Sequence, residues 1–326
     1  MAEGNTMNRY HRQMILPEIG EEGQRKLADA RVLIVGAGGL GSPVISYLAG
    51  AGVGTMSISD PDRISESNLH RQVIFAEDRI GLYKAQAASE FAQRRNKDLT
   101  SIWSPQAVTP DNAPNLAEHF DIVLDCADSY AASYTLSDAC LAANTPLISA
   151  SVLGLTGYCG GFCAGAPSLR AVFPDLPESA QTCATAGVLG PVVGIIGSIQ
   201  AQMALAVLLE MDPSPLGQFC HFDTTTMRST TFRFDGAPEP GEGFSFIADR
   251  HITADDFVID LRGEDETATP ARPDAARATV ETVAQLPNTT QRTVICCASG
   301  LRAWRAAERL KPHWHGEIVL VALGPT

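Results

Sequence analysis

Residues 36–41, Gly-Ala-Gly-Gly-Leu-Gly, satisfy the pattern G-x-G-x-x-G and constrain the fold more than any other segment. An apolar run at 31–36 leads into them and a helix-like segment at 42–50 follows, which predicts a strand, a glycine turn and a helix. In such a turn, backbone N–H groups can approach phosphates at the positive end of the helix. The pattern indicates a nucleotide site and leaves the nucleotide open, with NAD as the first expectation and a purely structural turn as the alternative.

Strand-like and helix-like segments alternate along the first part of the chain. Strands are expected at 31–36, 55–60, 121–126 and 146–150, and helices at 42–50, 84–95 and 131–143. Asp60 ends the second strand about twenty residues after the turn, where an acid can hold ribose hydroxyls. This alternation predicts an α/β fold, a Rossmann-like doubly wound and mostly parallel sheet with helices on both faces.

A break in the pattern divides the chain. Residues 235–243 crowd Gly, Pro and Glu together without any period, which indicates a linker. Two short apolar strands and a helix are expected beyond it, at 257–261, 293–297 and 302–310. We predict a first domain at 1–234, a linker at 235–247 and a second small α/β domain at 248–326.

The net charge and the apolar runs argue against several classes of protein. The chain has 37 Asp and Glu against 24 Lys and Arg, a formal net charge of −13, which gives no global support to nucleic-acid or anionic-membrane binding. The uncharged run 179–209 is as long as a membrane span, but its glutamines, proline and glycines predict a turn and a buried helix. The polar first residues lack a signal-peptide pattern, so we expect a cytoplasmic protein with reduced thiols.

An ordered set of polar residues follows the second strand, and it suits nucleotidyl transfer better than hydride transfer. Arginine and lysine can neutralise charge that develops on the α-phosphate and pyrophosphate, while an aspartate can hold Mg²⁺. Surface ion pairs would explain any single member but not the ordered set. The set comprises Asn68, Arg71, Gln72, Lys84, Asp125 and Asp128.

Several motifs together are similar to those of the ThiF/MoeB/HesA family, relatives of the ubiquitin-activating enzymes. The resemblance runs from about residue 8 to about residue 234, in order and at the expected spacing. It rests on Arg-Tyr-His-Arg-Gln at 9–13, the glycine turn, Ser-Asn-Leu-His-Arg-Gln at 67–72, Lys84, Leu-Asp-Cys-Ala-Asp at 124–128 and Thr-Cys-Ala-Thr-Ala-Gly-Val-Leu-Gly-Pro at 182–191.

The resemblance implies an adenylyltransferase that uses MgATP to activate the C-terminal glycine of a small ubiquitin-like sulfur carrier protein. It assigns Asp60 to the ribose and Asp128 to Mg²⁺. It also implies that Arg12 reaches the ATP of a partner subunit, which requires a homodimer. Cys183 stands where some members carry a thiol that attacks the adenylate or accepts sulfur, and a small buried residue is the other interpretation. The resemblance assigns ATP to Gly36, Gly38, Gly39, Gly41, Asn68, Arg71, Gln72 and Lys84.

The sequence departs from the family at its structural zinc, which members usually hold with two C-x2-C pairs. The first pair precedes a Phe-Pro dipeptide, and here Ser168 and Ala171 stand in place of its thiols. No second pair occurs around residues 232–250. We therefore predict no structural zinc. We expect Cys159 and Cys163, spaced C-x3-C, to be buried without a chemical role.

The second domain carries a motif of its own. Cys297 opens Cys-Ala-Ser-Gly-Leu-Arg at 297–302, between an expected strand and a helix, where backbone N–H groups suit a persulfide anion. This pattern and Ile-Asp-Leu-Arg at 259–262 resemble rhodanese domains, whose loop cysteine carries sulfane sulfur. Cys296 is then a buried neighbour. The domain is short, and a degenerate fold with a structural or carrier-docking role is the alternative.

Three functions are open at this point. In the leading one, the first domain makes the carrier acyl-adenylate, and a persulfide on Cys297, loaded by a donor such as a cysteine desulfurase, converts it to a thiocarboxylate. The second is an NAD(P)-dependent oxidoreductase with an unrelated tail, which has no use for Arg71 and Lys84 together. The third is a non-catalytic scaffold that binds nucleotide or carrier, and the intact polar set argues against it.

Overall fold

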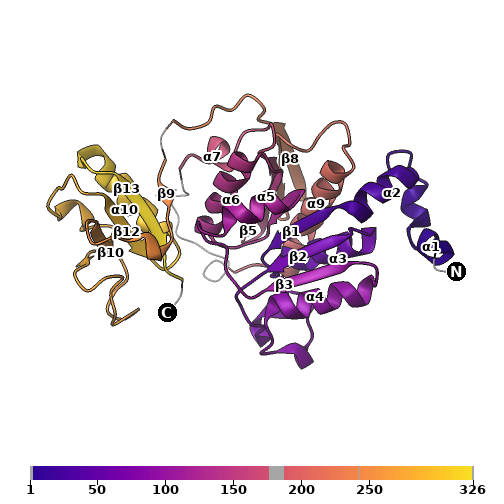
Figure 1. Cartoon of the computed structure of the whole chain (residues 1–326), viewed down its shortest axis with the longest axis horizontal. Helices are drawn as coiled ribbons and strands as arrows, with labels where there is room; N and C mark the ends of the chain where they lie inside the picture. Colours follow the sequence, from indigo (N-terminus) through magenta and orange to yellow (C-terminus); the bar gives the residue numbers. More distant parts are fainter. Residues whose placement is uncertain (1–2, 176–186, 242, 325–326) are drawn as a thin grey trace.

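The computed structural model describes residues 3–175, 187–241 and 243–324. Within them the strands form two sheets, one of eight strands and one of five. Figure 1 shows the larger sheet with its helices on the right and the smaller sheet on the left, joined by the chain between β8 and β9. The predicted linker at 235–247 ends in a short strand of the second sheet, β9 (Ser245–Phe246), so regular structure resumes inside it. The domain boundaries themselves stay a prediction.

The larger sheet has the strand order β3-β2-β1-β4-β5-β6-β7-β8. Five strands of this sheet are parallel: β1 (Arg31–Val35), β2 (Thr55–Ser59), β3 (Thr100–Ser104), β4 (Ile122–Asp125) and β5 (Leu147–Leu153). Three strands continue it antiparallel: β6 (Thr156–Phe162), β7 (Gln218–Asp223) and β8 (Arg228–Arg233). The predicted Rossmann-like, mostly parallel sheet is confirmed.

Alternating side chains of the strands build two cores, one on each face of the larger sheet. On β1, Val32 and Ile34 pack with α3 (Gly41–Ala51), α4 (Lys84–Arg95) and α9 (Gly190–Leu208). Leu33 and Val35 face the opposite way and pack with α5 (Ala113–His119) and α6 (Tyr130–Ala143). The remaining helices of this part are α1 (Glu3–Met14), α2 (Gly20–Asp29), α7 (Leu169–Val172) and the short 3-10 turns η1 (Glu66–Asn68) and η2 (Glu77–Arg79).

The helix α9 is long and apolar enough to cross a membrane by length and composition alone. Its buried side chains, among them Val192, Val193 and Ile196, join the core formed with α3 and the sheet. A core helix passes the same length test, so this feature is weak evidence for a membrane span. The helix predicted within residues 179–209 is thus present, beginning at Gly190.

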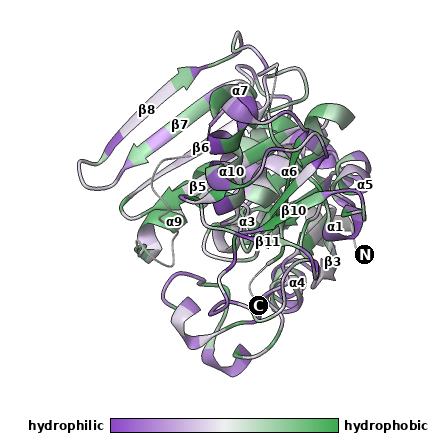
Figure 2. Cartoon of the chain, turned by 90° about the vertical axis from the view of Figure 1, so that its left-hand side faces the viewer, coloured by the Kyte–Doolittle hydropathy of each residue, from purple (hydrophilic) through white to green (hydrophobic). Residues whose placement is uncertain are grey.

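The antiparallel end of the sheet reaches away from the helices. Figure 2 shows β7 and β8 as a projecting hairpin with mixed polar and apolar residues. Every residue of β8 is exposed, and β3 likewise has no fully buried residue. Neither strand shows a buried stripe in its sequence, which is why the sequence did not predict them.

The second sheet is entirely parallel, in the order β11-β10-β12-β13-β9. One face packs against α10 (Leu301–Leu310), while loop residues such as Ile252 and Ala271 cover the other face. The other strands are β10 (Phe257–Asp260), β11 (Ala276–Arg277), β12 (Thr293–Cys297) and β13 (Ile318–Ala322), with 3-10 turns η3 (Asp249–His251), η4 (Val283–Gln285) and η5 (Lys311–His313).

β1 and β4 are neighbours in the larger sheet. The chain continues from β1 to β2 and β3 on one side, and from β4 to β5 on the other side, so the strand order reverses between β1 and β4. Ligands of open α/β sheets bind outside the carboxyl ends of strands at such a switch point. The glycine turn follows β1, and Asp125 and Asp128 lie at the end of β4 and beyond it. The topology therefore brings these two segments to one edge of the sheet.

Candidate functional site

Two of the turn glycines are required by the backbone itself. Gly36 has φ +96°, and a Cβ there would lie 2.6 Å from the carbonyl oxygen of Cys126. A Cβ on Gly41 would collide with the carbonyl oxygen of Gly36. Gly38 has more space, because the nearest atom to its Cβ position is Nε2 of Gln72 at 3.6 Å. The turn therefore folds tightly between β1 and β4, and Gly38 in its middle lies beside Gln72.

Asp60 ties the glycine turn to the end of β2. Its Oδ2 accepts a hydrogen bond from the N–H of Ala37 at 2.8 Å, and its Oδ1 accepts one from the N–H of Asp62 at 2.8 Å. Burial raises the pKa of Asp60, although Lys84 and these N–H donors oppose that effect. A carboxylate can accept about four hydrogen bonds, so the predicted bond to a ribose hydroxyl remains open to it.

Gln72 is the most informative polar side chain near the turn. It is 2% exposed, and its Oε1 has no hydrogen-bond partner among the described residues. A buried acceptor without a partner costs about 1–3 kcal/mol, and native structures keep few of them. A ligand that donates a hydrogen bond to this oxygen would remove that cost.

Asn68 and Arg71 belong to the same loop and bond within it. Asn68 Oδ1 accepts from the N–H of Ser65 at 3.2 Å and closes a capping box on η1. Arg71 Nη1 donates to the carbonyl of Ser67 at 3.0 Å and lies 2.8 Å from Nε2 of His70. The loop that carries Gln72 therefore also carries the amide of Asn68 and the guanidinium of Arg71.

Lys84 begins α4 with its side chain mostly buried, and its ammonium donates to Oδ2 of Asp62 at 2.7 Å. The side chain of Asp62 is 65% exposed, so this pair opens toward solvent. Sequence reasoning missed Asp62 as the partner of Lys84. Its position two residues after Asp60, in the Asp-Pro-Asp segment, is the signal that could have identified it.

The two aspartates after β4 differ in exposure. Asp125 is completely buried, accepts hydrogen bonds from Ser149 Oγ at 2.7 Å and from the N–H of Ala127 at 3.2 Å, and has a pKa that burial raises. Asp128 is exposed at the start of α6. Asp125 therefore braces the strand end, and Asp128 is the carboxylate available to a ligand. The described residues hold no cluster of three His, Cys, Asp or Glu able to bind a metal.

Cys297 lies at the end of β12, and its side chain is completely buried. Its Sγ accepts hydrogen bonds from the N–H groups of Gly300 at 3.1 Å and Ala303 at 3.3 Å, which belong to the turn before α10 and to its first residues. The thiol thus faces the N-terminal end of a helix. Cys296 is buried on the other side of the sheet, where burial raises its pKa to about 12.

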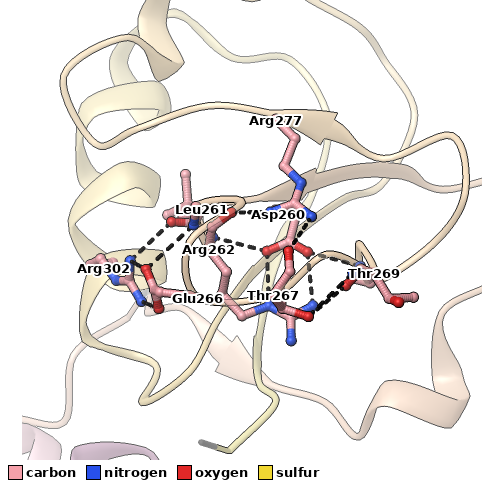
Figure 3. Close-up of polar contacts among 10 residues, drawn as sticks. Asp260, Leu261, Arg262, Glu266, Thr267, Thr269, Arg277 and Arg302 are labelled. Atoms are coloured by element: carbon pink, nitrogen blue, oxygen red, sulfur yellow. Dashed lines mark hydrogen bonds and ion pairs between the residues drawn. The ribbon is translucent and has the colours of Figure 1, made fainter. Parts of the chain in front are cut away.

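Each of the two motifs of the second domain (the tail), at 259–262 and 297–302, contains an arginine, and both arginines make structural contacts. Arg302 Nη2 donates to Oε2 of Glu266 at 2.6 Å, and its Nη1 donates to the carbonyl of Leu261 at 3.0 Å. Arg262 pairs with the buried Asp260 at 2.8 Å. Figure 3 shows both pairs fastening the loop after β10. These arginines shape the domain around Cys297 rather than contact its sulfur.

The segment that replaces the family's first zinc-binding pair is held by hydrogen bonds. Ser168 donates from its N–H and its hydroxyl to the carboxylate of Glu239, at 2.6 and 2.5 Å. Ala171 N–H in turn donates to Ser168 Oγ at 3.3 Å. Cys159 and Cys163 are completely buried, and burial raises the pKa of both thiols. The absence of zinc stays a prediction.

Comparison with known proteins decides the family. A model described as the ThiF family matches residues 10–242. The chain belongs to the ThiF family. It is 41% identical over 247 residues to "Adenylyltransferase and sulfurtransferase uba4" of Emericella nidulans, covering 71% of this chain and 51% of that protein. It is 42% identical over 220 residues to "Adenylyltransferase and sulfurtransferase MOCS3" of Bos taurus, covering 67% and 48%. The chain spans about half the length of the curated relatives it matches.

Solved structures agree with the ThiF assignment at the level of fold. The structure titled E. coli MccB with ATP has a TM-score of 0.64 and 22% identity, covering 72% of this chain and 74% of that chain. The structure titled E. coli MccB with MccA-N7isoASN gives a TM-score of 0.64 and 21% identity over the same shares. At this identity the similarity concerns the fold alone.

The structure gathers only part of the set that the ThiF resemblance assigns to ATP. The glycine turn, Asp60 and Gln72 are in contact, and Lys84 approaches them through Asp62. Arg12 is exposed on α1 and makes no hydrogen bond or ion pair with another described residue. Cys183 lies outside the described residues. The roles of all these side chains stay predictions.

Proposed function

We propose that this ThiF-family protein adenylates the C-terminal glycine of a small ubiquitin-like sulfur carrier protein with MgATP. The observation that carries the proposal is the buried side chain of Gln72, whose Nε2 lies beside the glycine turn and whose Oε1 has no partner, on the loop that also carries Arg71. The relatives named adenylyltransferase and sulfurtransferase support the same reaction class. An NAD(P) oxidoreductase gains no support from the matched family.

The chemistry follows from the positions of the charged groups. A C-terminal carboxylate is a poor electrophile and is already ionised at neutral pH, so no residue needs to deprotonate it. Arg71 and Lys84 would stabilise the charge that develops on the α-phosphate and the leaving pyrophosphate. Because Lys84 pairs with Asp62 at 2.7 Å, binding of phosphates requires its ammonium to turn from Asp62 or to bridge both anions.

Asp128 would hold Mg²⁺ together with the phosphates of ATP. Magnesium is commonly bound by one or two protein carboxylates plus phosphates and waters, so an isolated exposed carboxylate fits this role. Asp125 does not fit, because its oxygens are buried and accept bonds from Ser149 and Ala127. The ion would supply charge neutralisation next to the site of attack.

The second step in our proposal transfers sulfur from Cys297. A persulfide on Cys297 attacks the acyl carbon, AMP leaves, and an acyl disulfide forms. A further thiol then attacks the inner sulfur, which releases the carrier as a thiocarboxylate and leaves a disulfide for reduction. A sulfur donor such as a cysteine desulfurase would load the thiol again, in a reducing cytoplasm.

The assembly we propose is a homodimer in which Arg12 reaches the ATP of the partner subunit. Arg12 has no intrachain role among the described residues, and large apolar side chains nearby in sequence are exposed. Ile15 is 64% and Leu16 is 50% exposed, directly after α1. A second subunit covering this segment would bury them.

Intact mass spectrometry of candidate small proteins ending in Gly-Gly tests the proposal. Each candidate is mixed with this protein, MgATP and a persulfide donor. Gain of an AMP group supports adenylation, and exchange of one oxygen for sulfur supports the second step. If no candidate is modified while a nicotinamide cofactor is turned over, the oxidoreductase interpretation replaces ours.

A further inference from the structure

The Cys297 loop, residues 297–302, is packed against the first domain. One apolar cluster contains Cys297 and Trp304 from the tail together with Ala131 and Tyr134 from α6. Phe246 of β9 belongs to the same cluster, and Figure 1 shows β9 on the side of the second sheet that faces the larger sheet. The core around this thiol is therefore built from both domains.

Contacts at Gly300 show how closely the loop is covered. Gly300 has φ +85°, and a Cβ placed on it would lie 2.7 Å from the ring of Phe246 and 3.1 Å from Cβ of Ala131. Cys297, whose Sγ accepts from the N–H of Gly300, has no exposed surface. The mouth of the loop is thus covered by Phe246 of β9, the edge strand of the tail's own sheet, and by Ala131 of α6 in the first domain.

Arg170 of α7 holds the two parts together. Its Nε and Nη2 bind the carboxylate of Asp138 at 2.6 and 2.8 Å, and its Nη2 also donates to the carbonyl of Phe244 at 3.2 Å. The guanidinium carbon lies 4.8 Å from the ring centre of Tyr134 and 5.5 Å from that of Trp304. A cation placed over aromatic rings in this way is favourable, particularly where water is excluded.

A second attachment lies away from this cluster. Asp111, in the loop before α5, binds Arg250 Nε and His251 Nε2 of η3, both at 2.6 Å. Burial tends to raise the pKa of Asp111, but the bonds from His251 and Arg250 outweigh that effect and lower it. The tail is therefore tied to the first domain by an apolar contact with Arg170 and by this separate ionic contact.

We propose that docking of the tail on α6 is a gate for Cys297: the thiol is closed to external reagents while docked and becomes reactive when the domains separate. The inference rests on the proposed sulfur step for its biological meaning. A closed thiol cannot meet a persulfide donor, and an open one can. Undocking would therefore accompany both the loading of sulfur on Cys297 and its transfer to the carrier, because the docked thiol has no exposed surface.

Cys296 provides an internal control for the gate. It is adjacent to Cys297 and equally buried, but it packs with Val258, Val294 and Val319 of the tail alone. Undocking exposes the mouth of the Cys297 loop and leaves the surroundings of Cys296 unchanged. The ratio of the two alkylation rates therefore separates domain separation from unfolding.

The test measures alkylation of the full chain by iodoacetamide, followed by peptide mass spectrometry at each cysteine. Arg170→Ala removes the hydrogen bond from the guanidinium to the carbonyl of Phe244 and the contact with the ring of Trp304. It should raise the Cys297 rate about tenfold or more, without changing Cys296. Asp111→Ala should raise it severalfold. Arg233→Ala, which breaks an exposed pair with Asp235 on the far hairpin, is the matched control and should leave both rates unchanged.

If Arg170→Ala raises the alkylation rates of Cys296 and Cys297 equally, the tail of this variant has unfolded. The test then relies on Asp111→Ala, which leaves both cores intact. The gate is refuted if Asp111→Ala and Arg170→Ala leave the ratio of rates at its native value, or if Cys297 in the native protein reacts as fast as an exposed thiol. The assay contains no ATP, carrier or sulfur donor. Its outcome is therefore independent of whether the protein adenylates or transfers sulfur.

Discussion

The candidate nucleotide site and the Cys297 site differ in whether their polar groups already have hydrogen-bond partners. Beside the glycine turn, Gln72 Oε1 has no partner and Asp128 is exposed, so groups that could bind a ligand are free to do so. Around Cys297 the two N–H donors already bind the sulfur, and the side chain has no exposed surface. The first site leaves polar groups available to a ligand, whereas in our proposal the second must open before it reacts.

This difference has a structural origin. The candidate nucleotide site is made by local turns at the carboxyl ends of β1, β2 and β4, within one sheet. The Cys297 site is completed by Phe246 of the tail's own sheet and by Ala131 of α6 in the first domain. Contacts between domains can break without unfolding either part, so motion is expected at the second site.

The largest effect is expected from Cys297→Ala, which removes the proposed sulfur carrier. Thiocarboxylate formation should stop completely, while carrier-dependent ATP–pyrophosphate exchange stays at the native rate. Cys296→Ala is the matched control and should retain both activities apart from a cost in tail stability. Thiocarboxylate formed by Cys297→Ala would show that the tail is not the donor.

Lys84→Ala tests the other site in this comparison, the candidate nucleotide site. Loss of one preorganised charge in an active site costs about 10²–10³-fold in rate, so exchange should fall by that factor. Loading of sulfur on Cys297 should be unaffected. Lys97→Ala, at an exposed position beyond α4, is the control. Asp128→Ala should resemble Lys84→Ala, and normal exchange in either variant would refute the role assigned to that residue.

Asp260→Ala tests whether the tail depends on its buried ion pair with Arg262. Leaving one charge of such a pair unpartnered costs about 3–5 kcal/mol, which urea unfolding of the tail should detect. Burial would raise the pKa of Asp260, but the bonds from Arg262 and the backbone outweigh it and lower the pKa. This stability is therefore present above about pH 4, the unfolded pKa, and declines as pH falls through the lower folded value. A tail equally stable at pH 7 and pH 2 would contradict this account.

Gln72→Leu should have a smaller and selective effect. Loss of one hydrogen bond to bound nucleotide should weaken ATP binding about tenfold in calorimetry. The free protein should be no less stable, because the variant removes an acceptor that has no partner. A clearly destabilised variant with native affinity would mean that the Gln72 amide serves the fold.

No effect is expected from metal chelation on stability. Ser168 binds Glu239 where the family places zinc thiolates, so purified protein should hold less than about a tenth of an equivalent of zinc. Thermal unfolding should be the same with and without EDTA. Stoichiometric zinc, or a lowered melting temperature in EDTA, would overturn this prediction.

The sequence predicted several buried elements, such as the helix at 84–95 and the strand at 293–297, whose bounds the structure reproduces, but it missed the buried strand β13. It did not predict β3 or β8, because exposed strands show no apolar alternation. Residue types alone indicated the glycine turn and Cys297. The docking contact of Arg170 could not be predicted, because it depends on how two domains meet.

A crystal structure with ATP and Mg²⁺ tests the central claim most directly. Our account predicts the phosphates over the glycine turn, within hydrogen-bond distance of Arg71 and Lys84, with the Lys84 ammonium drawn from its present position on Asp62. A triphosphate bound away from both cations would contradict it, and the adenylation chemistry proposed for this protein would fail with it.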